Sequence, residues 1–217
     1  MTPRRARAPN PAPPPPSPTR ARGPRPRPYL TDGQLAVKAA LVLCGPFTPM
    51  LFMGEEWGAC TPFQFFTSHT DPEIAAATAS GRKKEFAAHG WPAGEVPDPQ
   101  DLKTFLRSKL DWTEPEEPPH ARLLSCYRAL LTLRRDRAEL SDPWLTHVSV
   151  DYDEAARWIV VHRGTLALVC NLGEDQVAVP IAGIPLLYWE SPTIGPSATT
   201  VPGHSFALLE TAPPGPR

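Results

Sequence analysis

The sequence predicts an α/β segment followed by an all-β domain, with a disordered tail in front. The expected bounds are residues 1–28 for the tail, 29–138 for a segment with the rhythm of a (β/α) barrel, and 139–217 for an antiparallel β-sandwich. Three observations carry this division. The tail is rich in Pro and Arg, an amphipathic helix then runs through a short connection into an apolar strand, and past Ser141 the apolar residues recur with period 2.

The tail holds seven arginines, eleven prolines and no acidic residue, a composition that cannot build a packed core. It is not a signal peptide, because no apolar core follows its arginines. Three interpretations remain open: a basic arm for nucleic acid, a Pro-rich ligand for a partner, or sequence without function, such as a misplaced start. We favour the last because the junction with the next segment is abrupt, and we expect no nucleic-acid partner.

The first predicted helix runs from Asp32, as its cap, to about Cys44. Gly45-Pro46 ends it, and a buried strand from Pro49 to Met53 follows after a very short connection. The apolar positions of the helix fall on one face: Leu35, Ala39, Val42 and Leu43.

The segment from Gly54 to about Pro118 reads as a long insertion between this strand and the last helix of the α/β segment. It is expected to contain a helix from Ser80, as its cap, to His89, and a second from Asp101 to Lys109. Long excursions on that side of a barrel usually shape a substrate site.

The last helix of the α/β segment is predicted from His120 to Arg135. The preceding Pro118-Pro119 suits a helix start, and arginines near the end favour the helix dipole. We interpret this cluster of Arg134, Arg135 and Arg137 as solvated charge, with anion binding as the alternative. The i, i+3, i+4 spacing is carried by Leu123, Leu124, Tyr127, Leu130, Leu131 and Arg134.

Short period-2 segments separated by Gly, Pro, Asp and Asn turns predict six to eight antiparallel strands beyond Ser141, which suggest a small sandwich. Trp158 and Trp189 are interpreted as core residues, with sugar binding as the alternative. The predicted strands are Val148–Val150, Trp158–His162, Leu166–Cys170, Val177–Val179, Leu186–Trp189 and Phe206–Leu209.

One stretch, from Thr48 to His69, carries a family resemblance. An apolar run ends at Gly54, and the two acids and tryptophan of Glu55-Glu56-Trp57 follow before an aromatic cluster. This stretch resembles the malto-oligosyltrehalose trehalohydrolases of the α-amylase family. The likeness spans roughly residues 30–212 and continues through Gly81–Phe86, Val96–Gln100, Phe105–Trp112 and the helix from His120.

The resemblance implies that Met50–Met53 lies in the eighth strand of a (β/α)8 TIM barrel and that a β domain trails it. It implies a cytoplasmic glycoside hydrolase of trehalose biosynthesis, which cleaves the α-1,4 bond next to the trehalose end of maltooligosyl trehalose. In the family, the catalytic Asp, Glu and Asp all precede the matched segment. The Asn-His-Asp motif that carries the last of these Asp residues does not occur before Thr48. We therefore expect no catalytic residue here and no turnover by this chain alone, as for a carboxyl-terminal fragment.

The resemblance also implies that Glu56, Trp57, Phe65, Phe66 and His69 lie beside the sugar-binding cleft of the complete enzyme, with structural packing as the open alternative for each. The neighbouring Glu55 and Glu56 are not read as a catalytic pair. Adjacent side chains of an extended segment point to opposite faces, whereas a retaining glycosidase needs carboxyl groups about 5–5.5 Å apart across one bond.

The remaining expectations concern partners. The four cysteines form no CxxC pair and suggest reduced thiols, so neither a metal nor a cofactor is predicted. No segment is apolar enough to span a membrane. The expected partners are maltooligosyl trehalose or another α-glucan, and the missing N-terminal part of the enzyme. The alternative function is a non-catalytic module that binds glucan or complements a barrel fragment.

Overall fold

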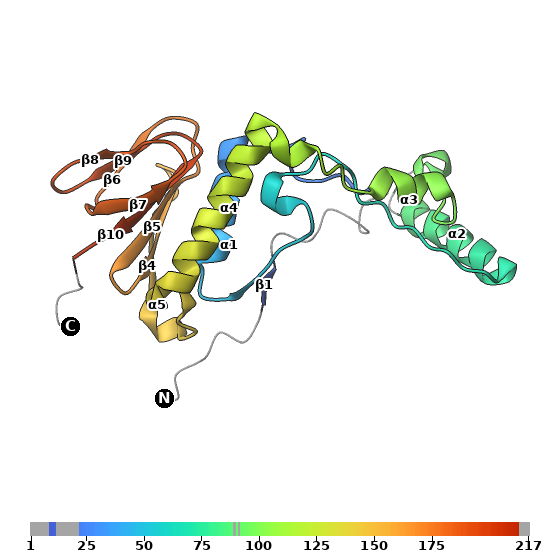
Figure 1. Ribbon diagram of the computed structural model, residues 1–217, viewed down its shortest axis with the longest axis horizontal. Coiled ribbons are helices and arrows are strands. Elements are labelled where there is room, and N and C mark those ends of the chain that lie inside the picture. The colour runs from blue at the N-terminus through green and yellow to red at the C-terminus, as the bar shows by residue number, and fades with distance from the viewer. Residues whose placement is uncertain (1–8, 12–21, 89, 91, 213–217) are drawn as a thin grey trace.

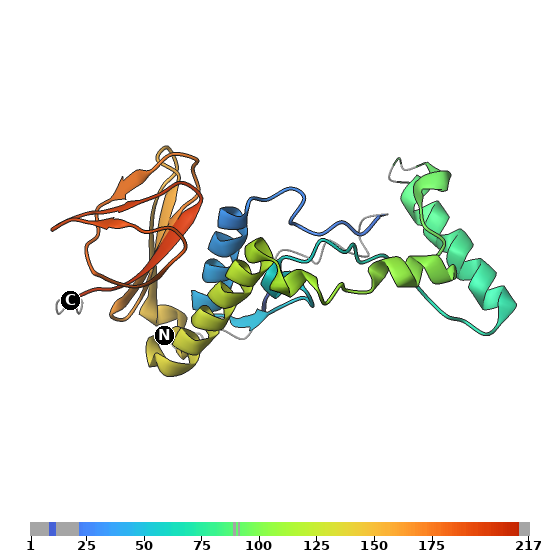
Figure 2. The ribbon, with the colours of Figure 1, turned by 45° about the horizontal axis from the view of Figure 1, so that its top comes forward.

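The computed structural model describes residues 9–11, 22–88, 90 and 92–212. The disorder predicted for residues 1–28 falls mostly on residues 1–8 and 12–21, which lie outside this range. Figure 1 shows an elongated chain with β-sheets at one end, helices α1 and α4 in the middle, and an arm of α2 and α3 at the other end. Figure 2 shows the same order from a second direction.

Helix α1, Asp32–Cys44, has the predicted length but a different cap. The side chain of Thr31 accepts a hydrogen bond from the backbone N–H of Gln34, and the Gln34 side chain accepts one from the N–H of Thr31. This reciprocal pair satisfies two otherwise free N–H groups, so the prediction of Asp32 as cap is wrong. The helix ends before Gly45, as predicted.

Helix α4, Pro118–Asp136, begins with proline at its first turn and packs against α1. Its buried face includes Leu123, Tyr127 and Leu130, which confirms most of the predicted apolar stripe, but Leu131 is 42% exposed and does not belong to it. The short helix α5, Ala138–Ser141, follows at once and buries Leu140 in the same core.

Two antiparallel sheets follow the helices. The larger has the order β3-β4-β5-β10-β7, and the smaller has the order β6-β9-β8. The bounds are Val148–Asp153 (β3), Trp158–Arg163 (β4), Leu166–Asn171 (β5), Val177–Val179 (β6), Ile184–Tyr188 (β7), Thr193–Ile194 (β8), Thr199–Val201 (β9) and Ser205–Glu210 (β10). The predicted period-2 segments therefore form antiparallel strands.

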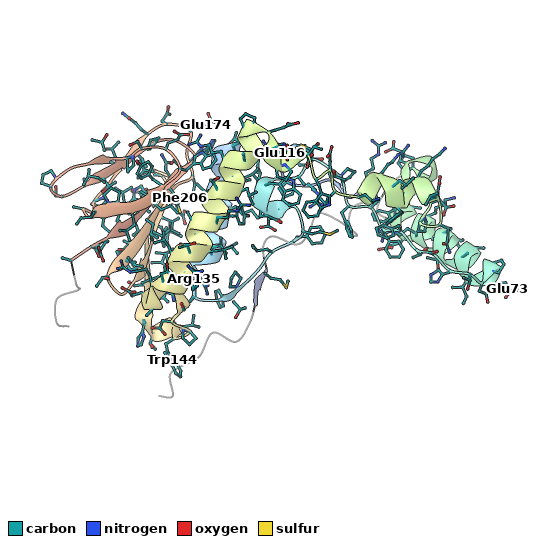
Figure 3. All side chains as sticks on the ribbon, in the orientation of Figure 1. Glu73, Glu116, Arg135, Trp144, Glu174 and Phe206 are labelled. Carbon is teal, nitrogen blue, oxygen red and sulfur yellow. The ribbon has the colours of Figure 1, made fainter. Side chains whose placement is uncertain are left out.

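The central strands β5 and β10 of the five-stranded sheet are buried on both faces, which explains their continuous apolar runs, whereas the edge strand β3 is mostly exposed. Along β5, Leu168 and Cys170 pack toward the helices, while Ala167 and Val169 pack toward the smaller sheet. The same alternation holds in β10, where Phe206 joins the core shared with the helices (Figure 3). Successive side chains of a strand point to opposite faces, so one apolar strand serves two cores. Trp189 lies in the first core and Trp158 against the second.

Two arginines hold the C-terminal end of α1 to the rest of the molecule. Arg134 donates to the carbonyl oxygens of Leu43, Gly45 and Phe47 at 2.6, 3.0 and 3.0 Å. Arg163 is buried and donates to the carbonyl of Cys44, the last residue of α1, at 3.4 Å, and to those of Glu139 and Asp142 at 2.7 and 2.6 Å. The last carbonyl oxygens of a helix lack hydrogen-bond donors within it, and Arg134 supplies a donor to that of Leu43. For Arg134, the interpretation as solvated charge is wrong.

The insertion forms η1 Glu55–Trp57, α2 Pro72–Ala87, η2 Ala93–Glu95, α3 Leu102–Ser108 and η3 Glu114–Glu116; a further short turn, η4, spans Leu145–His147 before the sheets. Helix α2 is capped by Asp71, so the predicted start at Ser80 is wrong. The helix predicted from Asp101 to Lys109 is confirmed as α3, and Asp101 is its cap. Only Phe86 and Val96 form a buried cluster in this arm, within the described residues.

Strand β2, Thr48–Met50, is shorter and more exposed than predicted. It pairs in parallel with β1, Pro9–Pro11, which is the one partner that the described residues give it. Met50, Leu51 and Met53 are 53%, 37% and 45% exposed. The expected burial of this strand is therefore wrong for the chain as it stands, because a parallel strand is buried only when neighbouring elements cover both of its faces.

Candidate functional site

The residues from Gly54 to His69, here called the acidic–aromatic loop, leave β2 through a tight turn. Gly54 and Gly58 flank η1 with φ angles of 81° and 66°, a left-handed conformation that glycine adopts without strain. A Cβ on Gly54 would lie 2.7 Å from Leu110 Cδ2 and 2.9 Å from Ala59 Cβ. The turn is therefore both sharp and closely packed, which fixes the direction of the acids between the two glycines.

Glu55 is a structural anchor. Its side chain is 9% exposed, and its Oε1 accepts hydrogen bonds from Lys38 Nζ at 2.8 Å and from the Tyr127 hydroxyl at 3.1 Å. Its Oε2 accepts from the backbone N–H of Phe52 at 3.1 Å. Burial first, and then the charge of Glu55, raises the pKa of Tyr127. The carboxylate thus ties the start of the loop to α1 and α4.

Glu56 is half-buried, and among the described residues its carboxylate has no hydrogen-bond donor. Its charge acts on Arg25 and Tyr127, so it lies near both. The two adjacent glutamates therefore have different environments. Glu55 is fully engaged by the scaffold, while the Glu56 carboxylate keeps its lone pairs for another donor.

Trp57 is buried, with 2% of its surface exposed. Its indole Nε1–H donates to Glu114 Oε2 at 3.1 Å, and its ring lies 5.3 Å from that of Trp112. Its carbonyl oxygen lies 2.7 Å from His120 Nδ1. These contacts join the loop to η3 and to the first turn of α4.

The aromatic residues form a chain toward the arm. Phe52, Phe63, Phe66 and Phe105 meet edge to face, with ring centroids 5.1, 5.9 and 5.1 Å apart along the series. Phe65 is 37% exposed, and the guanidinium of Arg82 on α2 lies 4.9 Å from its ring. Such edge contacts each add about 0.5–1.5 kcal/mol, so the chain stiffens the loop.

His69 is exposed at the far end of the loop, where its backbone N–H donates to Gln100 Oε1 at 3.2 Å. The five residues predicted for the site therefore occupy two places. Glu56 and Trp57 lie on η1 beside α4, whereas Phe65, Phe66 and His69 belong to the irregular stretch that leads to α2. Figure 1 shows this stretch running from the helices to the arm.

Residues 22–28, expected to belong to the disordered tail, contact this loop instead. Arg25 is 3% exposed, donates to the carbonyl of Met53 at 2.7 Å and also to that of Thr61. The carbonyl of Gly23 accepts from the N–H of Phe63 at 2.8 Å. Burial lowers the pKa of Arg25, and nearby glutamates oppose that effect. Composition could not reveal this role, because the contacts are long-range and made to backbone atoms.

Glu114 is a support of the acidic–aromatic loop that the sequence did not suggest. Its Oε1 accepts from the N–H of Cys60 at 3.0 Å while its Oε2 holds Trp57. A run of acids and prolines before a helix is typical of solvated surface, and no local pattern shows that one of these acids bonds to a residue 54 positions earlier.

Among the helices of the described residues, none has the length and apolar character that a membrane span requires.

The chain is similar to known proteins over most of its length. The family described as a domain of unknown function, DUF3459, matches residues 143–208. A malto-oligosyltrehalose trehalohydrolase of Mycobacterium tuberculosis strain H37Rv is 56% identical over 186 residues, which are 86% of this chain and 32% of that protein. The enzyme of the same name from Rhizobium sp. strain M-11 is 52% identical over 155 residues, 71% of this chain and 26% of the relative.

Among solved structures, a proposed α-amylase from Salmonella typhimurium superposes with a TM-score of 0.75 at 33% identity. That match covers 90% of this chain and 33% of the other. The chain thus spans about a third of the length of the Mycobacterium tuberculosis relative. It is a homologue of the malto-oligosyltrehalose trehalohydrolases, within the α-amylase family of glycoside hydrolases.

Proposed function

We propose that this chain is the carboxyl-terminal part of a cytoplasmic glycoside hydrolase of trehalose biosynthesis. The reaction is hydrolysis of the α-1,4-glucosidic bond next to the trehalose end of maltooligosyl trehalose, which releases trehalose. The observation that carries this proposal is the identity of 56% over 186 residues with a relative named for that activity. The substrate is an oligosaccharide of α-linked glucose.

In this proposal β2 belongs to the last strand of a (β/α)8 barrel, α1 and α4 are helices on its outside, and the two sheets form the trailing sandwich. The exposed side chains of Met50, Leu51 and Met53 support it. Apolar surface gains about 25 cal/mol for each Å² removed from water, so these residues favour a covering element. The partner is the remaining part of the enzyme, with one strand on the free edge of β2 and another in the place that β1 takes in this chain.

The acidic–aromatic loop then borders the sugar cleft, and its residues divide into contacts and supports. Glu56, Phe65, Phe66 and His69 are the proposed contacts. A free carboxylate accepts from sugar hydroxyls, and flat rings cover the apolar face of a pyranose. Trp57 supports the loop from beneath, because its ring is buried and its N–H is held by Glu114.

We propose that the 217-residue chain alone does not turn over substrate. Hydrolysis with retention needs a nucleophile and a general acid about 5–5.5 Å apart. Glu55 is bound to Lys38 and Tyr127, so it is not available for either role. Sugar binding by Glu56 and the rings would not by itself lower the barrier, because only interactions stronger in the transition state accelerate the reaction.

A chimera tests this proposal. The matched 186 residues of the Mycobacterium tuberculosis relative are replaced by the corresponding residues of this chain, and trehalose release is measured. We expect activity in the chimera. Glu56→Gln or Phe66→Ala in the chimera should raise KM or lower kcat, whereas Arg135→Ala, on the exposed face of α4, should change neither.

A folded chimera without trehalose release would refute the proposal. If the isolated chain instead bound maltooligosaccharide while the chimera stayed inactive, the chain would be a non-catalytic glucan-binding module. Restoration of activity on mixing the chain with the remainder of the relative would show the complementing contact directly.

A further inference from the structure

Three side chains of different chemistry meet where the acidic–aromatic loop contacts α4. Cys60 follows η1, Glu114 lies in η3, and His120 lies in the first turn of α4. One ligand atom from each lies within 4.8 Å of the other two. Sulfur, carboxylate oxygen and imidazole nitrogen are the three donors that zinc takes in proteins. We propose that this cluster binds a thiophilic divalent cation of the zinc type.

His120 keeps one ring nitrogen available as a ligand. The residue is 5% exposed, and its Nδ1 lies 2.7 Å from the carbonyl oxygen of Trp57. A carbonyl oxygen only accepts, so Nδ1 must carry the hydrogen, and Nε2 of the neutral ring keeps its lone pair. Metal-bound histidines typically donate their other N–H to a carbonyl or carboxylate in this way.

Glu114 is also held in place. Its two oxygens accept from Cys60 N at 3.0 Å and Trp57 Nε1 at 3.1 Å. Each carboxylate oxygen has a further lone pair, so both hydrogen bonds can persist when one oxygen binds a cation. Trp57 thus contacts two of the three groups, His120 through its carbonyl oxygen and Glu114 through its N–H.

The charges favour a cation at this place. The residue Cys60 is exposed, and its sulfur lies beside the negatively charged carboxylate of Glu114. A bound divalent cation would stabilise the thiolate beside the carboxylate. Zinc ligands lie about 2.0–2.3 Å from the metal, so the cluster must contract by about 1 Å. The exposed side chain of Cys60 can supply this movement by rotating about χ1.

A cation held this way would fasten the loop after η1 to η3 and α4, 54 and 60 residues further along the chain. Three protein ligands leave a fourth tetrahedral position for water. The site is independent of the proposed sugar contacts, since it uses none of Glu56, Phe65, Phe66 or His69. Its role is to fix the position of the loop that carries them.

The test uses the 217-residue chain and two probe ions. Co²⁺ reports thiolate coordination through a sulfur-to-metal absorption band in the near ultraviolet, and Zn²⁺ affinity and stoichiometry follow from calorimetry. We expect one ion per chain. Cys60→Ser should abolish the cobalt band and weaken Zn²⁺ binding by at least about tenfold, the lower end of what removing even an outer partner costs.

Glu116→Gln is the matched control, since Glu116 lies in the same short helix as Glu114 but is exposed and outside the cluster (Figure 3). It should leave both measurements unchanged, whereas Glu114→Gln should weaken binding. Zn²⁺ should also slow modification of the Cys60 thiol in the wild-type chain. Absence of a thiolate band, or equal Zn²⁺ affinity in Cys60→Ser and Glu116→Gln, would overturn the proposal.

Discussion

Replacing Arg134 by alanine tests how the helices are held to β2. The Arg134 guanidinium donates three hydrogen bonds of 2.6–3.0 Å to carbonyl oxygens at and beyond the end of α1. A hydrogen bond to a charged group contributes about 1.5–3 kcal/mol, and a buried acceptor left without a partner costs about 1–3 kcal/mol. Since the three bonds share one donor and water reaches part of the site, we expect a loss of about 3 kcal/mol rather than their sum.

The assay is urea unfolding followed by far-UV circular dichroism. At a slope of about 2 kcal/mol/M, a loss of about 3 kcal/mol lowers the midpoint by about 1.5 M. Arg135→Ala is the control, because the adjacent side chain is 75% exposed and pairs only with Asp136 among the described residues. It should shift the unfolding free energy by less than about 0.5 kcal/mol. Equal midpoints for the two variants would refute the capping role of Arg134.

Three further predictions concern individual side chains. Glu55→Gln should cost about 3 kcal/mol of unfolding free energy, because it leaves a nearly buried lysine without its partner, while Glu56→Gln should cost less than about 1 kcal/mol; equal losses in thermal unfolding would contradict the division of roles. Only Cys60 of the four thiols should react with a maleimide before unfolding, as counted by mass spectrometry; a second fast thiol would show that a core opens. The hydrogen bond from His147 holds the pKa of Asp142 below its usual range, so its stabilising contribution is present above about pH 4 and is lost as the pH falls through the folded-state pKa. Asp142→Asn should remove this loss of stability at acid pH. A pH profile of stability that is the same in the variant would exclude a contribution from Asp142.

The elements with strong periodicity could be predicted from the sequence. Helices α1 and α4 and the strands β4, β5 and β10 follow their apolar patterns, because each buries apolar side chains in a core. The short strands β8 and β9 were not predicted, since neither carries an apolar run. Helix α2 was missed over its first half, since its alanine-rich start has no apolar stripe and Phe86 is its one buried residue. Its cap, Asp71, followed by proline, is the local signal that could have placed it.

Long-range polar contacts could not be predicted. Arg25, Arg134 and Glu114 each look like surface charge in the sequence, yet each bonds to groups 28 to 91 residues away. The expectation that Glu55 and Glu56 point different ways agrees with the structure, where only Glu55 is bound by α1 and α4. The division was predicted from backbone alternation, although the segment forms a short 3-10 helix rather than an extended strand.

The most direct measurement is the identification of products from maltooligosyl trehalose incubated with the isolated chain and, separately, with the chimera. We expect no product from the chain alone, and trehalose with a shortened maltooligosaccharide from the chimera. Robust trehalose release by the 217-residue chain would contradict it, because catalytic carboxylates would then have to lie among its own residues.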